Sequence, residues 1–252
     1  MTDSYPEPGQ KNDLRVKASI EALKDHLLKT EVADRVVKII LFGSQARGSA
    51  TESSDVDVMV LTADGACTEK ALMDHVHDFM VESGTPLEVV TAGIADLISP
   101  RDYFVYHVLQ HGIEVYSMEK TQLKKAMAES ILGLCDEYLD SAREVLRNNR
   151  VRLSVDAGYN AAELAAKALI LLKQDDLPGS HGGVVAVFGQ LYVKAGVVDR
   201  ELGRDLNVGL KLRNEARYRP DATLTAENAT AVLDLAERLV GLARDQVEQV
   251  PE

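Results

Sequence analysis

A glycine–serine pair at the end of a short apolar run is the feature that most constrains the fold of this chain. Residues 36–42 are mainly apolar and rich in β-branched side chains, which predicts a buried strand. Gly43 ends the run, and its missing Cβ lets the backbone turn and approach a ligand closely. Ser44 would open a helix, whose first backbone N–H groups are unpaired and lie at the positive end of its dipole. The pair therefore predicts a phosphate-binding turn.

Two aspartates follow this turn after a short polar segment. Asp55 and Asp57 begin a second apolar run, residues 55–61, which predicts a second buried strand. Side chains alternate along a strand, so the two carboxylates face the same way, about 7 Å apart. Carboxylates in this arrangement can bridge a pair of Mg²⁺ ions spaced about 3.5–4 Å. Each motif alone is common, but together at this spacing they predict a nucleotide-binding fold with a metal site.

A third carboxylate lies in the next strand-like run, residues 86–91. Glu88 is the one acidic residue there, among leucine and valine neighbours. Desolvating a carboxylate in such a strand is costly unless it is paired or bound to metal. Glu88 is therefore the candidate third ligand. The alternative is that it lies on the solvent face of an edge strand.

The segments Gly43–Gly48 and Ser54–Asp57 resemble the signature of the minimal nucleotidyltransferases, relatives of DNA polymerase β and kanamycin nucleotidyltransferase. The resemblance covers residues 13–118 and implies a small mixed sheet with helices, ATP as the donor, Mg²⁺ as the cofactor and AMP as the transferred group. By family position the catalytic metal ligands are Asp55, Asp57 and Glu88, while Gly43 and Ser44 hold the β and γ phosphates. Arg47 either neutralises phosphate or braces the turn by pairing with a carboxylate.

The pattern changes near residue 118, which predicts an α+β protein with an N-terminal sheet domain, residues 13–118, and an all-helical bundle, residues 119–252. Residues 1–12 are polar, contain two prolines and are expected to form a disordered tail without a signal peptide. A hydrophobic content of 46% supplies enough core for two domains. The expected strands are 36–42, 55–61, 87–91 and 113–116, and the expected helices are 14–28, 69–82, 94–111, 123–145, 157–172, 183–195, 199–217 and 226–248, the last capped by Thr225.

The second half resembles a HEPN domain, a helical bundle often partnered with minimal nucleotidyltransferases and often a ribonuclease of toxin–antitoxin pairs. Residues 156–169, 180–184 and 212–218 carry this resemblance. The ribonuclease pattern places a histidine four to six residues after an arginine, but Arg213-Asn214 is followed at that distance by Tyr218. Tyrosine, with an ordinary pKa near 10, is a poor proton carrier at neutral pH, so nuclease activity is doubtful.

Other roles remain open for the same residues. Arg213 could bind a phosphate, and Tyr218 could stack on a base or accept AMP. Alternatively, both could simply close the bundle against Asp221 or a neighbouring helix. His181, in a glycine-flanked loop, is expected to be a helix-start or turn residue rather than a catalyst.

Three functions are compatible with these motifs. The first is AMP transfer from ATP to a protein hydroxyl, as in toxin–antitoxin pairs. The second is adenylylation of a small molecule, as in aminoglycoside resistance enzymes, and an acidic chain would suit such a cationic substrate. The third is a nucleotide-sensing or RNA-binding module with a degenerate HEPN site. A net charge of −12 argues against nonspecific coating of nucleic acid, although the helical domain could still bind RNA locally.

Two widely separated cysteines, Cys67 and Cys135, suggest neither a disulfide framework nor a cysteine-based zinc site. No apolar run approaches membrane-spanning length. We therefore expect a cytoplasmic protein without a membrane partner, and the HEPN resemblance implies a homodimer.

Overall fold

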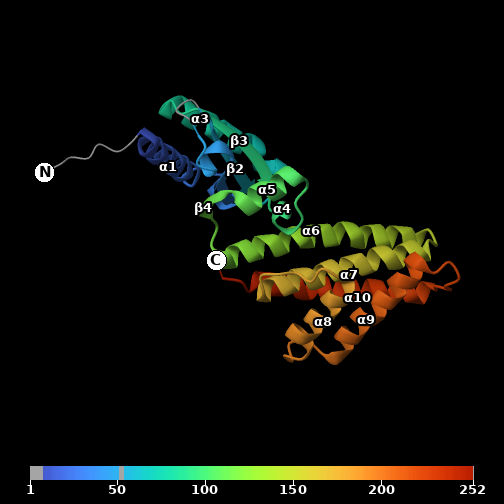
Figure 1. Ribbon diagram of the computed structural model, residues 1–252. Helices are drawn as coiled ribbons and strands as arrows, with labels where there is room; N and C mark the ends of the chain where they lie inside the picture. The colour runs from blue at the N-terminus through green and yellow to red at the C-terminus, as the bar shows by residue number, and fades with distance from the viewer. Residues whose placement is uncertain (1–7, 51–53, 252) are drawn as a thin grey trace. The chain divides into compact units, whose positions relative to one another are not determined.

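The computed structural model describes residues 8–50 and 54–251, and the chain divides into two compact units, residues 1–123 and 124–252 (Figure 1). The first unit contains a mixed sheet and the second is helical, so the predicted α+β class is confirmed. Residues 1–7 of the expected disordered tail lie outside the described residues. Residues 8–12 are helical and belong to α1 (Pro8–Leu27), which starts earlier than expected.

Four strands form the sheet of the first unit in the order β3-β2-β1-β4. They are β1 (Val36–Leu41), β2 (Val56–Thr62), β3 (Leu87–Gly93) and β4 (Ile113–Ser117), each close to its predicted range. β1 pairs antiparallel with β2 and β4, whereas β2 and β3 are parallel. The parallel pair needs a crossover, which α3 (Ala66–Ser83) provides.

Alternation along the strands separates a core face of the sheet from the face that carries the acidic residues. Val56, Val58 and Val60 on β2 join the buried cluster that α1 and α3 complete, with Ile20 and Leu72 among its members. Successive side chains of a strand point to opposite faces. Asp57 therefore lies on the face away from this core.

The predicted single helix over residues 94–111 is wrong, because the chain forms two helices there. α4 (Ala95–Ile98) stops at Ser99, which is extended with φ −148° and ψ 95°, as expected of a residue that precedes a proline. α5 (Tyr103–His111) then starts anew, because the Asp102 side chain accepts a hydrogen bond from the Val105 N–H at 2.8 Å. Pro100 and the Asp102 cap thus divide the apolar pattern.

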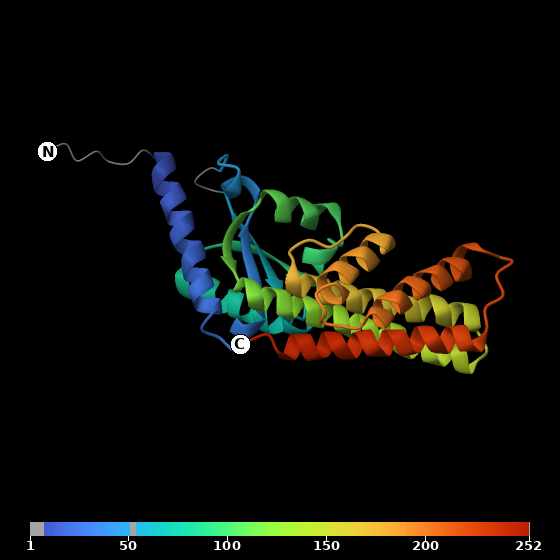
Figure 2. The ribbon, with the colours of Figure 1, turned by 90° about the horizontal axis from the view of Figure 1, so that it is seen from below.

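The second unit is built around α7 (Val151–Lys173), whose alanine-rich faces are buried on several sides. α6 (Lys120–Arg147), α7 and α10 (Ala226–Glu248) run alongside one another, as seen from below in Figure 2. α9 (Arg200–Tyr218) approaches α7 closely because Gly209 has no Cβ, which would otherwise lie 3.1 Å from Cδ2 of Tyr159.

Two details of the helical unit refine the predictions. The Thr225 cap of α10 is confirmed, and Asn228 completes a capping box with it. The helix expected over residues 183–195 instead begins with α8 (His181–Phe188), capped by Ser180, and continues as the single π-helical turn η2 (Gly189–Val193).

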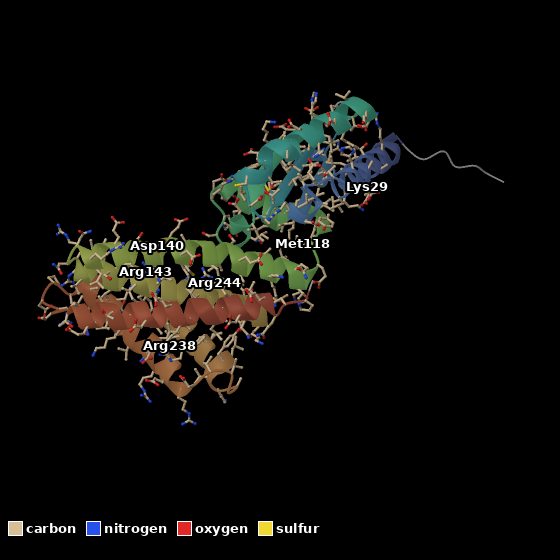
Figure 3. All side chains as sticks on the ribbon, turned by 180° about the vertical axis from the view of Figure 1, so that it is seen from behind. Lys29, Met118, Asp140, Arg143, Arg238 and Arg244 are labelled. Atoms are coloured by element: carbon tan, nitrogen blue, oxygen red, sulfur yellow. The ribbon has the colours of Figure 1, made fainter. Side chains whose placement is uncertain are left out.

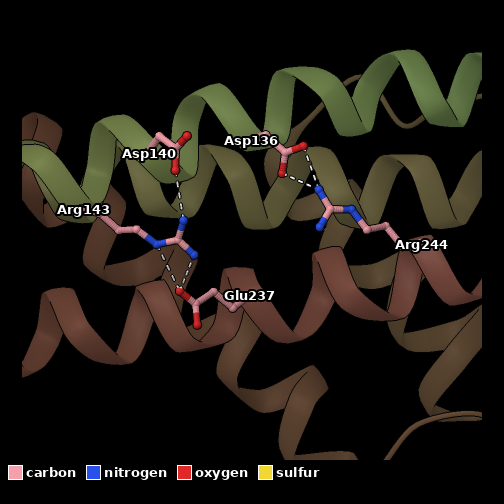
Figure 4. Close-up of polar contacts among 5 residues, drawn as sticks. All are labelled: Asp136, Asp140, Arg143, Glu237 and Arg244. Carbon is pink, nitrogen blue, oxygen red and sulfur yellow. Dashed lines mark hydrogen bonds and ion pairs between the residues drawn. The ribbon is translucent and has the colours of Figure 1, made fainter.

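Exposed ion pairs join α6 to α10 on the outside of the helical unit (Figures 3 and 4). Arg244 donates to both carboxylate oxygens of Asp136 at 2.6 and 2.7 Å, and Arg143 reaches Glu237 at 2.7 Å. Exposed pairs of this kind each contribute about 0–1 kcal/mol. They help to fix how α6 and α10 align, whereas the apolar core supplies most of the stability.

Candidate functional site

The predicted phosphate turn follows β1 directly and requires glycine for two reasons. Gly43 has a φ of +70°, a backbone conformation that L side chains rarely adopt. A Cβ on Gly43 would also lie 1.8 Å from Oδ2 of Asp57, closer than any non-bonded contact allows. The adjacent Phe42 N–H donates to the Asp57 carbonyl oxygen at 2.9 Å. The absence of a Cβ on Gly43 thus lets the turn lie directly against Asp57. Gly43 also begins the short helix α2 (Gly43–Ala46), in which Ser44 is the second residue.

Asp57 lies within a cluster of negative charge. In the register of the parallel pair, Asp57 on β2 is directly opposite Glu88 on β3, and Asp55 stands just before β2. Burial raises the pKa of the Asp57 carboxyl, and the charges of Glu88 and Asp55 raise it further. Arg47 and a hydrogen bond from the Ser44 backbone oppose this shift in pKa. Glu88 and Asp55 are therefore both close enough to disfavour the charged form of Asp57.

This donor set fits a hard divalent cation, since all its side-chain ligands would be carboxylate oxygens. Within residues 8–50 and 54–251, no three acidic, histidine or cysteine side chains converge into a finished metal site. However, the mutual repulsion at Asp57 is the electrostatic condition that a bound Mg²⁺ relieves. The residues therefore fit the ion by charge and by chemistry.

The structure places Glu88 at an exposed position beside Asp57. Its strand, β3, is an edge strand of the sheet, and the Glu88 side chain is exposed. The same side chain nevertheless lies across from Asp57 and acts on its pKa. Exposure at an edge leaves Glu88 accessible to a substrate.

The position of Arg47 bears on its two predicted roles. Arg47 ends the short helix α2 and is exposed, and its charge lowers the pKa of Asp57. Arg47 is thus close enough to Asp57 to stabilise its negative charge. Its guanidinium is also exposed, so a phosphate could reach it.

The helical unit brings the HEPN-like residues together on α9. Arg213 is buried, with only 3% of its surface exposed, and its Nη1 donates to Oδ1 of Asn214 at 3.1 Å. Its guanidinium carbon lies 5.7 Å from the centre of the Tyr218 ring, whose side chain is 64% exposed. Arg213 is therefore buried, whereas the Tyr218 ring beside it is accessible to solvent.

Asp156 on α7 completes this group, and sequence reasoning did not assign it a role. Its Oδ1 lies 3.6 Å from Nε of Arg213, and its Oδ2 lies 3.5 Å from Nη2 of Arg217. Arg213 thus packs against a neighbouring helix, while Asp221 pairs with Arg219 instead. The signal for Asp156 was its position at the start of the segment that resembles HEPN domains.

A second polar cluster in this unit was not predicted. Glu163 on α7 is buried, yet it binds Nζ of Lys167 at 2.9 Å and Nδ1 of His181. Burial acts to raise the pKa of Glu163, but the hydrogen bonds from Lys167 and His181 outweigh it and hold that pKa below its ordinary value. His181 is the first residue of α8, which confirms its expected place at a helix start.

A surface groove of about 630 Å³ runs along the C-terminal part of α9. Tyr218 is one of the residues that line it, and its exposed ring is accessible to a ligand or a second protein. The other residues that line the groove are Asn207, Leu210, Lys211, Asn214, Glu215 and Arg219.

Two further expectations concern the cysteines and the membrane. Cys67 is exposed and Cys135 is buried, and both are free thiols. None of the helices in the described part of the chain combines the length and apolar character needed to cross a bilayer.

Comparison with known proteins assigns both halves of the chain. Residues 22–121 match the family described as "Polymerase beta, Nucleotidyltransferase", and residues 128–246 match the family described as "HEPN domain". These two ranges correspond to the unit that carries Gly43 and Asp57 and to the unit that carries Arg213 and Tyr218.

Curated relatives from Methanocaldococcus jannaschii are named either as a toxin or as protein adenylyltransferases. "Putative toxin MJ0605" is 31% identical over 134 residues, which cover 52% of this chain and 98% of that protein. "Putative protein adenylyltransferase MJ1305" is 36% identical over 78 residues, which cover 29% of this chain and 49% of that protein. "Putative protein adenylyltransferase MJ0604" is 46% identical over 43 residues, which cover 16% of this chain and 43% of that protein.

The chain spans about half of each adenylyltransferase-named relative and almost all of the toxin-named one. This chain therefore belongs to the polymerase β nucleotidyltransferases through its first unit and to the HEPN family through its second.

Proposed function

We propose that this nucleotidyltransferase transfers AMP from ATP to a hydroxyl group of a protein, in a system of the toxin–antitoxin type. The observation that carries the proposal is the contact of the Gly43 turn with Asp57, which itself lies opposite Glu88 on the neighbouring strand. A phosphate turn and a carboxylate cluster at the same end of a sheet suit the donor side of nucleotidyl transfer.

Each residue at this end of the sheet has its own role in the proposed reaction. Gly43 and Ser44 hold the β and γ phosphates of ATP through their backbone N–H groups. Asp55, Asp57 and Glu88 would hold Mg²⁺, which supplies positive charge against the attacking and leaving oxygens when bound. Arg47 adds a fixed positive charge beside Asp57 and balances part of the carboxylate cluster.

The reaction is an in-line displacement at the α-phosphorus of ATP. The acceptor oxygen forms the new O–P bond while the bond to the β-phosphate bridging oxygen breaks, and pyrophosphate leaves with that electron pair. The acceptor hydroxyl proton passes to a carboxylate at the edge of the site, for which the exposed Glu88 is the accessible candidate.

The names of two relatives support a protein as the acceptor, since both contain the words "protein adenylyltransferase". Tyr218 is a candidate acceptor on this chain, because its side chain is 64% exposed and lines an open groove. The acceptor could belong to the same chain or to another copy. The proposal also includes a cytoplasmic location, where ATP is available, and the homodimer that the HEPN resemblance implies.

The test begins with Mg²⁺, α-labelled ATP and the purified chain, followed by intact mass and peptide mapping. We expect label on protein, and we expect Asp55→Asn to abolish it while thermal unfolding stays cooperative. Asp64→Asn is the matched control, since Asp64 is an exposed aspartate just beyond the other end of β2 and should leave transfer unchanged. Unchanged transfer in Asp55→Asn would refute the site assignment.

Tyr218→Phe then tests the acceptor. We expect the variant to lose a mass gain that maps to this tyrosine, whereas Tyr116→Phe, a change in β4, should keep it. Label that appears only on added small molecules, with no mass gain on protein, would favour the aminoglycoside-like alternative instead.

A further inference from the structure

α5 exposes a group of aromatic and imidazole rings that the proposed chemistry does not use. Among the described residues, four aromatic side chains are exposed large hydrophobic groups, and three of them lie on this nine-residue helix. The opposite side of α5 buries Val105 and Val108. We define the α5 stripe as the side chains of Tyr103, Phe104, His107 and His111, all of which are exposed.

Three rings of the α5 stripe lie in a row, and the fourth, Phe104, contacts the residue that precedes the phosphate turn. The centroids of Tyr103 and His107 are 6.1 Å apart, and those of His107 and His111 are 4.5 Å apart. Phe104 meets Phe42 edge to face at 5.4 Å. Because Phe42 directly precedes Gly43, the stripe is continuous with the turn that holds phosphate in the proposed function.

The charges around the stripe narrow the class of ligand. Residues 102–117 contain no lysine or arginine. Surfaces that bind single-stranded nucleic acid combine stacking rings with a positively charged groove that follows the backbone. In contrast, α5 itself carries no lysine or arginine, and the preceding Arg101 is engaged by Asp96 and by the Thr91 carbonyl oxygen. A protein partner of ordinary affinity needs about 20–30 residues on each side, more than one short helix presents. A mononucleotide needs only a flat ring surface, because its phosphates are held elsewhere.

We propose that the α5 stripe binds the nucleobase of the nucleoside triphosphate whose phosphates lie at Gly43 and Ser44. The base is joined to those phosphates through one ribose, and the stripe begins one ring contact away from the turn. Stacking is tolerant of base identity, because every base has a π face. The stripe therefore contributes affinity for nucleotides in general, and this proposal rests on the proposed function.

The test compares a nucleotide with a ligand that lacks a base. The probes are 2-aminopurine riboside triphosphate, whose fluorescence is quenched when the ring stacks, and inorganic triphosphate, both with Mg²⁺. The chain contains no tryptophan, so protein emission does not obscure the signal. We expect the double variant Tyr103→Ala/His107→Ala to weaken nucleotide binding about tenfold and to lose the quenching, with triphosphate affinity unchanged.

Gln110→Ala is the matched control, because Gln110 is exposed on the same helix but lies outside the stripe. It should retain nucleotide affinity. Unchanged nucleotide binding in the double variant, equal weakening by Gln110→Ala, or equal loss of triphosphate binding would each overturn the proposal.

Two further outcomes separate this proposal from the one on which it rests. A wild-type protein that binds both ligands equally, without quenching, would refute the stripe but leave the phosphate site intact. A wild-type protein that binds neither ligand would refute the proposed function and the stripe together. An oligoribonucleotide that binds more tightly than the nucleotide, through the stripe, would also overturn the proposal.

Discussion

Replacing Gly43 with alanine should destabilise the fold for two reasons. The first is backbone strain, because an alanine at φ +70° is disfavoured by about 1–2 kcal/mol, less the smaller gain from a stiffer unfolded chain. The second is a collision, because the new Cβ would lie 1.8 Å from Oδ2 and 2.7 Å from Cγ of Asp57. Asp57 must then swing away, or the end of β1 must shift.

The magnitude follows from the displacement that the new Cβ forces. Moving the Asp57 carboxylate gives up the hydrogen bond from the Ser44 backbone but also lessens the repulsion from Glu88 and Asp55, so these two effects oppose each other. Forcing an extra methyl group into occupied space typically costs about 1–3 kcal/mol. Together with the backbone strain, the Gly43→Ala variant should be destabilised by about 2–4 kcal/mol. Gly84→Ala is the matched control: Gly84 has a φ of +66°, but nothing lies within 4 Å of the position that a new Cβ would take. It should be destabilised by only about 1 kcal/mol.

Hydrogen exchange of the β1 and β2 peptides, read by mass spectrometry, measures the stability of the sheet separately from that of the helical unit. Calorimetric titration with ATP and Mg²⁺ supplies the second readout, in which Gly43→Ala should lose binding and Gly84→Ala should keep it. Equal destabilisation of the two variants would refute the steric argument. Wild-type ATP affinity in Gly43→Ala would refute the placement of the phosphate site.

Three more predictions concern the acidic site and the helical unit. In EDTA, Asp57→Asn should stabilise the fold slightly, because burial and the charges of Glu88 and Asp55 raise the pKa of Asp57; added Mg²⁺ should stabilise the wild type but not the variant in a thermal melt. Glu163→Gln should cost about 2 kcal/mol at pH 7 in denaturant unfolding. Because the folded-state pKa of Glu163 is lowered from 4.5, its contribution is present above that pH, and the two proteins should converge as pH falls below it. Without ATP the wild type should leave labelled RNA uncut, since Tyr218 replaces the expected histidine; a Tyr218→His variant that also leaves RNA uncut would weaken this reasoning.

Local patterns in the sequence were enough to predict the strands, the long helices and the Thr225 cap. Short apolar runs rich in β-branched residues predicted strands near their observed bounds, and an alanine-rich stretch predicted α7. These features are determined by residues that are close together in the chain, so they can be predicted from a single sequence. The break between α4 and α5 also has a local cause, in Pro100 and Asp102. It was not predicted because apolar residues recur at helical spacing on both sides of it.

Polar pairs between helices could not be predicted in the same way. Glu163 binds His181 across the interface of α7 and α8, and Asp156 lies beside Arg213 across that of α7 and α9. The partners of each pair lie on different helices, and the sequence pattern does not determine the paths of the loops that connect these helices. Composition indicates that buried charges need partners, but only packing decides which residues become those partners.

The relation between Gly43 and Asp57 shows how a local signal and a tertiary contact can coincide. The glycine was predicted from the turn alone, whereas the carboxylate in the space that a Cβ would fill depends on the antiparallel pairing of β1 with β2. The parallel pairing of β2 with β3 in turn sets Asp57 opposite Glu88, where burial and like charge disfavour ionisation. The hydrogen-bonded ladders of the sheet hold this unfavourable cluster in place, since the acidic side chains do not stabilise one another. An unfavourable charge cluster that a rigid scaffold holds in place is what the proposed binding of a cation and a phosphate would require.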